Sequence, residues 1–300
     1  MRVFITGVAG FVGAHLARRL VNEGVEVIGI DVVPHSSASR LQGIKLDYRW
    51  QSCQDLVHVD ADYVVHFASI ADVPLATRSP IFTLQQNVLG TAMLLEACAR
   101  DDGFQRIVIQ SSESVYGHAK RVPIPEDEPL NPSNIYGASK AAQEMVAMSY
   151  HHSHKLPVTI LRSSTLYWAG ARPNQAIPIF ITKALNGEPI PVEGEGKQSR
   201  DFNALPDLAD AILLALTNQK AVGQAFNIAS GTEVTILELA QKVLALNGGG
   251  DIVFRPGRPG EGAVRLAPDI SKARLLLGYT PKISFDEGLR TTYESYRTGV

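Results

Sequence analysis

A tyrosine and a lysine four positions apart, Tyr136 and Lys140, are the side chains whose spacing most directly suggests chemistry. On a helix these two positions lie one above the other on the same face, so both can point into one pocket. A free phenol has a pKa near ~10, and making it a base near pH 7 takes roughly 3 units, or ~4 kcal/mol, of preferential anion stabilisation. A fixed ammonium group close by would supply much of it.

Tyr-x-x-x-Lys alone is also an ordinary amphipathic helix pattern, so its interpretation depends on its surroundings. The helix that carries it is predicted to begin near Asn134, and a serine-rich segment at 111–117 lies upstream of it. Ser112 in that segment comes just after an apolar strand predicted at 106–110. A hydroxyl at the end of a strand and a phenol at the start of the next helix are expected to share one site.

The first predicted strand spans residues 2–6, and a glycine-rich turn follows it. Gly7 and Gly10 permit positive φ angles and let backbone N–H groups approach a pyrophosphate at a helix N-terminus. Gly13 lets that helix pack close to the strand. The spacing is G-x-x-G-x-x-G, and its place between a strand and a helix predicts a dinucleotide site.

The second predicted strand, at 25–30, ends in Asp31. A carboxylate there can accept hydrogen bonds from the ribose hydroxyls of adenosine and would repel a 2′-phosphate. Arg40 is the first basic residue after His35. The sequence therefore predicts NAD as the cofactor in preference to NADP.

Strands and helices alternate through the first half of the chain, with strands expected at 62–67, 106–110 and 157–161 and a long helix at 81–99. This alternation predicts an α/β fold with a doubly wound parallel sheet, whose carboxyl edge forms the ligand crevice. We expect residues 1–164 to form this domain, the chain to return to it around 205–230, and residues 165–300 to form mainly a smaller substrate-binding lobe.

Composition excludes several classes of protein. The 300 residues are 45% hydrophobic with a net charge of -2, and basic residues form no long run, so nucleic acid and membrane partners gain no support. Two cysteines cannot build a disulfide framework, and the first residues resemble a strand and not a leader, so a cytoplasmic protein is expected. His151, His152 and His154 are interpreted as a solvated helix end, and no metal site is predicted.

With these features in place, the chain resembles the extended short-chain dehydrogenase/reductases that act on nucleotide sugars, the NAD-dependent epimerase/dehydratase family. The matching motifs cover nearly the whole length: Thr6 to Gly13, His66 to Ser69, Asn87 to Thr91, Ser111 to Gly117, Tyr136 to Lys140, Arg200 to Phe202, Asn227 to Gly231 and Arg258 to Gly260.

The resemblance implies roles for individual residues. Tyr136 would remove the proton from a sugar hydroxyl, Ser112 would hydrogen-bond the same oxygen, and Lys140 would anchor the nicotinamide ribose and lower the tyrosine pKa. Arg200 and Arg258 resemble the arginines that hold the nucleotide diphosphate. The resemblance also gives cofactor contacts to Phe11, Val12, Asp47, Ala68 and Asn87, and substrate contacts to Thr165 and Arg172.

Two departures from the family pattern concern the sugar pocket. Where Arg-Pro-Phe-Asn is frequent, this chain has Arg162-Ser163-Ser164-Thr165, so an expected asparagine contact is missing. Trp168 stands where the family often has a small Tyr-Gly-Pro-Gly turn. Arg172 lies in a loop that resembles one whose arginine meets a uronate carboxylate in some 4-epimerases.

Several functions remain open from the sequence. The leading interpretation is a nucleotide-sugar 4-epimerase, on a UDP-hexose or UDP-uronate, in which the keto intermediate takes the hydride back on its other face. A dehydratase would need an acid and a base beside Ser112, and only Glu113 is present there. A uronic acid decarboxylase is disfavoured by Ser114, and a non-catalytic dinucleotide-binding module by the intact Ser112, Tyr136 and Lys140. The helices bearing Tyr136 and Ile81 resemble the pair that forms a four-helix homodimer interface in the family.

Overall fold

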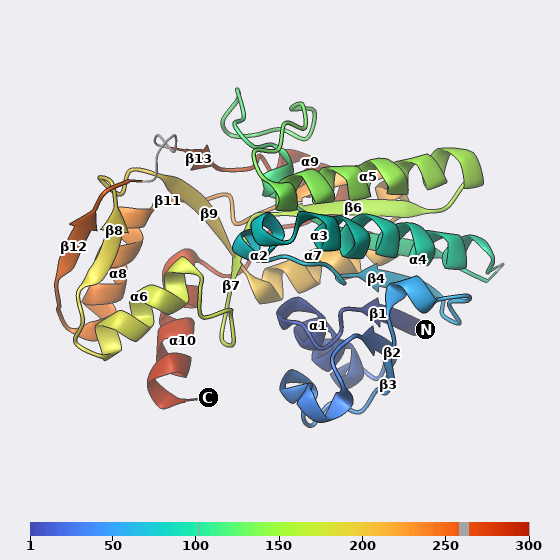
Figure 1. Ribbon diagram of the computed structural model, residues 1–300, viewed down its shortest axis with the longest axis horizontal. Coiled ribbons are helices and arrows are strands. Elements are labelled where there is room, and N and C mark those ends of the chain that lie inside the picture. The colour runs from blue at the N-terminus through green and yellow to red at the C-terminus, as the bar shows by residue number, and fades with distance from the viewer. Residues whose placement is uncertain (102, 258–263, 300) are drawn as a thin grey trace.

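Seven parallel strands form the central sheet of the protein, in a computed structural model that describes residues 1–101, 103–257 and 264–299 (Figure 1). Their order is β10-β6-β5-β4-β1-β2-β3, and each neighbouring pair is parallel. The predicted parallel, doubly wound α/β fold is therefore confirmed. The strands are β1 (Arg2–Thr6), β2 (Glu26–Asp31), β3 (Asp47–Trp50), β4 (Tyr63–His66), β5 (Arg106–Ser112), β6 (Val158–Ser163) and β10 (Gln224–Ile228).

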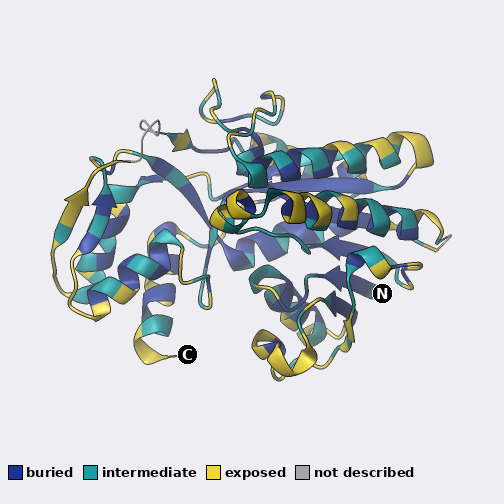
Figure 2. Ribbon diagram, in the orientation of Figure 1, coloured by how far each residue is buried: buried dark blue, intermediate teal, exposed yellow. Residues whose placement is uncertain are grey.

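Helices cover both faces of this sheet, which is why its inner strands are mostly buried and dark in Figure 2, whereas the edge strand β3 is largely exposed. Alternate strand residues point to opposite faces. Val3 and Ile5 pack against the helices α1 (Phe11–Asn22), α7 (Leu205–Thr217) and α9 (Ser271–Leu277). Phe4 packs on the other face, against α4 (Gly90–Ala99) and α5 (Ile135–His154).

The long helix expected at 81–99 is present in three consecutive parts. They are α3 (Pro80–Leu84), a π-helical segment (Gln85–Leu89) and α4. A short helix α2 (Val73–Arg78) precedes them. Across the described part of the chain, no helix combines the length and the apolar character needed to cross a membrane.

A smaller lobe lies at the left of Figure 1. Its strands β7 (Thr165–Tyr167), β9 (Ser199–Ala204), β11 (Glu233–Thr235) and β13 (Arg265–Leu266) form one sheet, and β8 (Ile190–Glu193) pairs with β12 (Ile252–Arg255). Its helices are α6 (Ala176–Leu185), α8 (Ile236–Asn247) and α10 (Phe285–Thr298). Three elements that alternate in sequence with those of the lobe belong to the central layer instead. Strand β10 is part of the central sheet, and α7 and α9 pack on one face of it. A domain boundary at residue 164 stays a prediction.

The strand order reverses between β1 and β4, because the chain builds outward from β1 through β2 to β3 and then returns to place β4 on its other side. Thr6 and His66, the last residues of these two strands, are register partners. The loops that follow them diverge at the carboxyl edge of the sheet. In open α/β sheets this switch point is where ligands bind.

Helix α5 begins at a cap and rests on the segment that follows β5. The Asn134 side chain accepts a hydrogen bond of 2.9 Å from the backbone N–H of Gly137. A Cβ built on Gly137 would lie 2.4 Å from the carbonyl oxygen of Ser114. Glycine therefore lets the first turn of α5 touch the backbone of the 3-10 turn Glu113–Val115.

We expect Gly137→Ala to lower the free energy of unfolding by about 1–3 kcal/mol, because overpacking against a backbone carbonyl outweighs the ~1 kcal/mol gained by alanine in a helix. Urea denaturation measures the change. The matched control is Gly90→Ala, where the nearest atom to the new Cβ is 3.7 Å away, and it should be neutral or slightly stabilising. Equal stability of both variants would contradict the close contact.

Candidate active site

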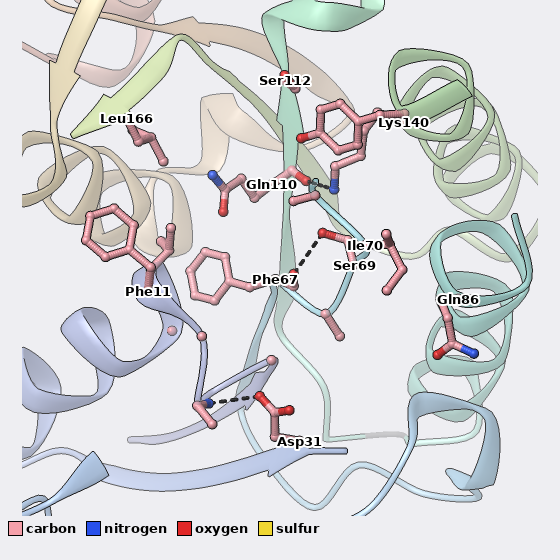
Figure 3. A pocket seen from close by; sticks show the side chains of 18 of the residues that line it. Phe11, Asp31, Phe67, Ser69, Ile70, Gln86, Gln110, Ser112, Lys140 and Leu166 are labelled. Carbon is pink, nitrogen blue, oxygen red and sulfur yellow. Dashed lines mark hydrogen bonds between the residues drawn. The ribbon is translucent and has the colours of Figure 1, made fainter. Parts of the chain in front are cut away.

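A cleft of about 590 Å³ opens along the carboxyl edge of the sheet (Figure 3). It is lined by the turn after β1, the ends of β2 and β5, the segment that follows β3, the loop after β4, the first turns of α5, and β7 with the loop that precedes α6. Segments distant in sequence therefore meet where the topology predicts a ligand site. Among the predicted residues, the lining contains Gly7, Gly10, Phe11, Val12, Gly13, Asp31, Ala68, Ser112, Glu113, Tyr136, Lys140, Thr165 and Arg172.

The glycine turn at one end of the cleft leaves no space for side chains. Gly7 has a φ of +68°, and a Cβ on it would lie 2.7 Å from the backbone nitrogen of Ala68. A Cβ on Gly13 would lie 2.3 Å from the carbonyl oxygen of Gly7. Gly10 caps α1 without any side-chain hydrogen bond, so the N–H groups of the first turn have no side-chain acceptor there. A turn without side chains at these glycines, with N–H groups at a helix N-terminus that no side chain engages, fits the binding of a pyrophosphate group.

Asp31 lies beside this turn, at the end of β2. Its carboxylate accepts hydrogen bonds from the backbone N–H of Ala9, at 2.9 Å, and of Val33, at 3.2 Å. These bonds hold the side chain on the wall of the cleft, at the end opposite Ser112 in Figure 3. The donor set of the turn and the carboxylate together fit an adenosine diphosphate portion of a dinucleotide.

Arg40 also lines the cleft, which the sequence did not indicate. Its guanidinium donates a hydrogen bond of 3.1 Å to the carbonyl oxygen of Gly170, in the loop after β7. On the far side of the same loop, the Asn174 amide donates to the Asp72 carboxylate at 2.7 Å. The loop that carries Arg172 is thus tied on both sides to segments of the central α/β layer.

Asp47 is not brought to the cleft. It begins β3, opposite Ile28, and it pairs with Arg49 at 2.8 Å. Three residues separate it from the carboxyl edge, roughly 10 Å along a strand. Gln51, Ser52 and Cys53, which follow β3, line the cleft instead. The adenine contact inferred for Asp47 is therefore not supported, and Asp47 is left out of the site proposed below.

Asn87 is completely buried, and its amide is used inside the protein. The oxygen accepts from the backbone N–H of Ile70 at 2.6 Å, and the nitrogen donates to the Ile70 carbonyl and to the Ser139 hydroxyl, at 3.1 and 2.8 Å. Gln86 and Gly90, one position before and three after it, line the cleft. Asn87 therefore fixes the loop after β4 against α5 and does not face the cofactor region.

Ser112, Tyr136 and Lys140 are brought together at the other end of the cleft. Burial raises the pKa of Tyr136, against a hydrogen bond with Ser112 and the charge of Arg172, which both lower it. Lys140 donates to the Gln110 carbonyl at 2.7 Å and to the Gln143 amide oxygen at 2.8 Å, as Figure 3 shows for Gln110. The expected lowering of the Tyr136 pKa by Lys140 is therefore not found in the protein chain alone.

Burial also lowers the pKa of the Lys140 ammonium to about 7, although the carboxylate of Glu144 opposes the change. Desolvation disfavours whichever form carries the charge, so it moves a phenol and an ammonium in opposite directions. Near neutral pH Lys140 can therefore gain or lose a proton at small cost, whereas the phenol of Tyr136 stays protonated in the protein chain alone. A lysine that titrates in this range suits proton transfer to and from a nearby hydroxyl group.

Glu113 is a buried carboxyl group in the same wall. One oxygen accepts a hydrogen bond of 2.9 Å from the Thr165 hydroxyl, and the other is buried without a hydrogen-bond partner. Burial raises the pKa of Glu113 to about 8, against the opposing charge of Arg200. The side chain is therefore mostly protonated at pH 7.

The three predicted arginines differ in their placement. Arg172 lines the cleft, close enough for its charge to act on Tyr136. Arg200, in β9, is not among the lining residues, and it donates to the Ser199 carbonyl at 2.8 Å. Its charge acts on Glu113. Arg258 lies outside the described residues.

Gln175 is a second lining residue to which the sequence assigned no role. It precedes α6, and its amide oxygen is buried without a hydrogen-bond partner. A glutamine in a polar loop gives no signal in the sequence, because only the fold of the small lobe turns it toward the central sheet.

Comparison with known proteins agrees with this architecture. Residues 3–229 match the model of the NAD dependent epimerase/dehydratase family. The dTDP-glucose 4,6-dehydratase of Streptomyces niveus is 33% identical, over 99% of this chain and 93% of its own length.

Two solved structures show the same fold over the whole chain. The UDP-glucose 4-epimerase of Thermotoga maritima, with UDP-glucose, has a TM-score of 0.92 at 29% identity and covers 100% of this chain and 99% of its own. The UDP-glucuronic acid 4-epimerase of Bacillus cereus, with UDP-glucuronic acid and NAD, has a TM-score of 0.90 at 28% identity and covers 100% of both chains. On the family match and these full-length similarities, the chain belongs to the NAD-dependent epimerase/dehydratase family.

Proposed function

We propose that the protein is a nucleotide-sugar 4-epimerase, and that a UDP-sugar is its substrate. The observation that supports this choice within the family is the number of carboxyl groups at the sugar end of the cleft. Among the described lining residues only Asp31 and Glu113 carry one. Asp31 ends β2 and Glu113 follows β5, three strand spacings apart and so separated by roughly 14 Å across the sheet. A single carboxyl group, Glu113, remains for the sugar.

This count favours epimerisation because the reaction needs only one proton-transfer group at the oxidised carbon. In the proposed site Tyr136 takes the proton from the sugar hydroxyl and later returns it, and Ser112 holds the same oxygen. Lys140 keeps a positive charge near the phenol and binds the nicotinamide ribose. NAD, when bound, supplies the hydride acceptor and donor, and Gly7, Gly10, Gly13 and Asp31 would hold it.

A dehydratase is the second candidate, and one observation favours it. Glu113 holds a proton at pH 7 and lies next to Ser112, so it could protonate a leaving hydroxyl group. The Streptomyces niveus relative is a dTDP-glucose 4,6-dehydratase. Elimination also requires removal of a carbon-bound proton, however, and Ser114 stands where a second carboxylate would be needed.

The substrate proposal rests on the arginines and on the solved relatives. Arg200 and Arg258 are proposed to bind the diphosphate, a task suited to a planar bidentate donor. The two solved 4-epimerases contain UDP-glucose and UDP-glucuronic acid. Arg172 supports a uronate here, because its charge already lies at the sugar end. Thr165 is proposed to contact the sugar, although its hydroxyl is bonded to Glu113.

We also propose a homodimer through a four-helix interface. Helices α3 and α5 lie side by side in Figure 1, and large apolar side chains on this side of the molecule are exposed. Ile81 is 67% exposed, Phe82 47% and Met145 63%. A second copy would remove this surface from water, and sedimentation of the purified chain tests the proposal.

The buried free thiols of Cys53 and Cys98 are in keeping with a cytoplasmic location.

We expect NAD to bind more tightly than NADP, and Asp31→Asn to reduce that preference. Removing the negative charge should change the ratio of the two affinities by about 1–2 kcal/mol, or roughly 5–30-fold. Calorimetric titration with each dinucleotide measures it. Asp47→Asn is the matched control, because Asp47 lies away from the cleft and its loss should leave the ratio unchanged. Equal affinities in the wild-type protein would remove Asp31 from the site.

We expect Tyr136→Phe to lower turnover by about 10²–10⁴-fold while NAD affinity changes little, since only the phenolic oxygen is lost. Steady-state kinetics and NAD titration together separate the two effects. Tyr150→Phe on the same helix removes a hydroxyl that bonds Glu96 instead, and its turnover should match wild type. A Tyr136→Phe variant with most of its activity would assign the base to another residue.

The decisive test of the reaction is mass spectrometry of a panel of UDP- and dTDP-sugars incubated with the protein in deuterated water. A 4-epimerase should give an isomer of the substrate with no deuterium on carbon. A dehydratase should give a product lighter by one water that carries solvent deuterium, because it must break and remake a second C–H bond.

Glu113→Gln adds a pH test to the same assay. As pH rises through about 8 Glu113 ionises, and its negative charge raises the pKa of Tyr136, so the wild-type rate should fall. Glutamine stays neutral, so epimerisation by the variant should match wild type near pH 7 and decline less above pH 8. A water-loss product that disappears in this variant would make Glu113 the acid/base of a dehydratase.

A further inference from the structure

Lys140 is held by a side chain that lies outside the motifs of the site. Its ammonium group has three hydrogens, of which one goes to the Gln110 carbonyl and one to the amide oxygen of Gln143. Gln143 follows Lys140 by one turn of α5 and is completely buried. One hydrogen of Lys140 therefore remains for the cleft, which Lys140 lines.

The Gln143 amide is itself fixed by a chain of buried groups. Its nitrogen donates to the Thr91 hydroxyl at 2.7 Å, and Thr91 donates to the Asn87 carbonyl at 2.6 Å. The Nε2 atom of His66 lies 2.8 Å from the same hydroxyl. The Nδ1 atom of His66 lies 2.6 Å from the hydroxyl of Thr6, in the strand that leads into the glycine turn. The chain thus joins α5, α4, β4 and β1.

The direction of every hydrogen bond in this chain follows from counting hydrogens. Thr91 has one hydroxyl hydrogen, which goes to the Asn87 carbonyl, so both Gln143 and His66 Nε2 must donate to Thr91. The Thr6 oxygen accepts from two backbone N–H groups, so its own hydrogen goes to His66 Nδ1. Both assignments require the same neutral tautomer of His66.

The direction of these hydrogen bonds decides which end of the Gln143 amide contacts Lys140. A reversed amide would place its NH2 group against the ammonium and its oxygen against Thr91, whose hydrogen is already committed. Burial lowers the pKa of His66 to about 3, so the ring stays neutral and these directions are retained over the working pH range.

We propose that Gln143 is a positioning residue for Lys140, which it holds by presenting its amide oxygen, oriented through Thr91 and His66, to the ammonium group. The inference rests on the proposed function in that Lys140 acts on Tyr136 and on the cofactor. Gln143 is assigned no contact with substrate or cofactor. It sets the place of the Lys140 amino group and favours its charged form.

The other groups around Lys140 leave the effect of Gln143 on the pKa of Lys140 measurable. Glu144, on the same helix, favours the ammonium form, and its carboxylate is engaged with Arg162 at 2.7 Å. Tyr136 lies one turn earlier on α5. His66 on β4 is neutral, β5 presents the neutral Gln110 carbonyl, and the neutral Thr91 hydroxyl of α4 contacts Gln143. Gln143 is thus a close, neutral acceptor whose replacement should change the titration of Lys140.

The test is an NMR titration of the protein with ¹³Cε-labelled lysine, in which the Lys140 signal is assigned by its absence in Lys140→Met. A hydrogen bond to a charged group corresponds to about one to two pH units of titration midpoint. Gln143→Glu adds a negative partner and should raise the midpoint by about that much. Gln143→Leu removes the acceptor and should lower it by a similar amount.

Thr91→Val and Thr91→Ser form a second pair, in case Gln143→Leu does not fold. Valine removes the acceptor that orients the Gln143 amide without touching Lys140, and the midpoint should fall. Serine keeps the hydroxyl, and the midpoint should match wild type. Thermal unfolding of each variant separates this effect from a loss of stability. Midpoints that agree within about 0.3 units in all folded variants would overturn the proposal, because a residue that only fills space would leave them unchanged.

The titration needs no substrate, so it is independent of the reaction. A protein that is inactive on every sugar but shows the expected midpoints would overturn the proposed function and keep the role of Gln143. In an active enzyme the same shift should appear in the pH profile of kcat, with KM for the sugar nearly unchanged, because Gln143 lies behind Lys140 and away from the substrate.

Discussion

The contact between the first turn of α5 and the backbone that follows β5 is the constraint on which the site depends. Gly137 permits it, since any Cβ there would overlap the Ser114 carbonyl. Asn134 fixes where the helix begins. Together they place Tyr136, one residue before the glycine, beside Ser112, two residues before the carbonyl. A helix displaced by the width of one methyl group would separate the phenol from the serine.

Burial is the second determinant, and it acts on all three ionisable groups near this contact. The pKa of Glu113 and that of Tyr136 are raised and that of Lys140 is lowered, in each case chiefly because the charged form loses water. The chain alone therefore favours neutral groups at the sugar end. Any ligand that brings a fixed positive charge would favour the phenolate, and one that brings a negative charge would oppose it.

The sequence predicted the parts of the structure that follow local rules. The glycine turn and the helix start at Asn134 each depend on a few neighbouring residues, and both are present where they were expected. The parallel sheet followed from the alternation of strands and helices. In these cases backbone conformation and hydrophobic period carry enough information.

The remaining features depend on contacts between distant segments. The register of β3 against β2 decides that Asp47 lies away from the cleft, and no pattern in the intervening loop fixes that register. Asn87 is bonded to Ile70 and Lys140 to the Gln110 carbonyl, and both partners are distant in sequence. Neither the burial of Asn87 nor the direction in which Lys140 points could therefore be derived from spacing. Arg40 reaches the cleft only because Gly170, 130 residues further on, lies across from it.

The departures from the family pattern form one connected arrangement. Thr165 stands where an asparagine is frequent, and its hydroxyl is bonded to Glu113, the unusual acid beside Ser112. Ser164 lies 3.3 Å from Asp201, whose carboxylate also accepts from the backbone N–H groups of Ser230 and Gly231. Among the described residues that line the cleft, neither the asparagine contact nor a second carboxylate is present at the sugar end, and a hydroxyl paired with a protonated acid stands in their place. Such a pair can donate to and accept from a hydroxyl group of the sugar without adding charge, which would suit the proposed epimerisation, in which one ring is held in two configurations.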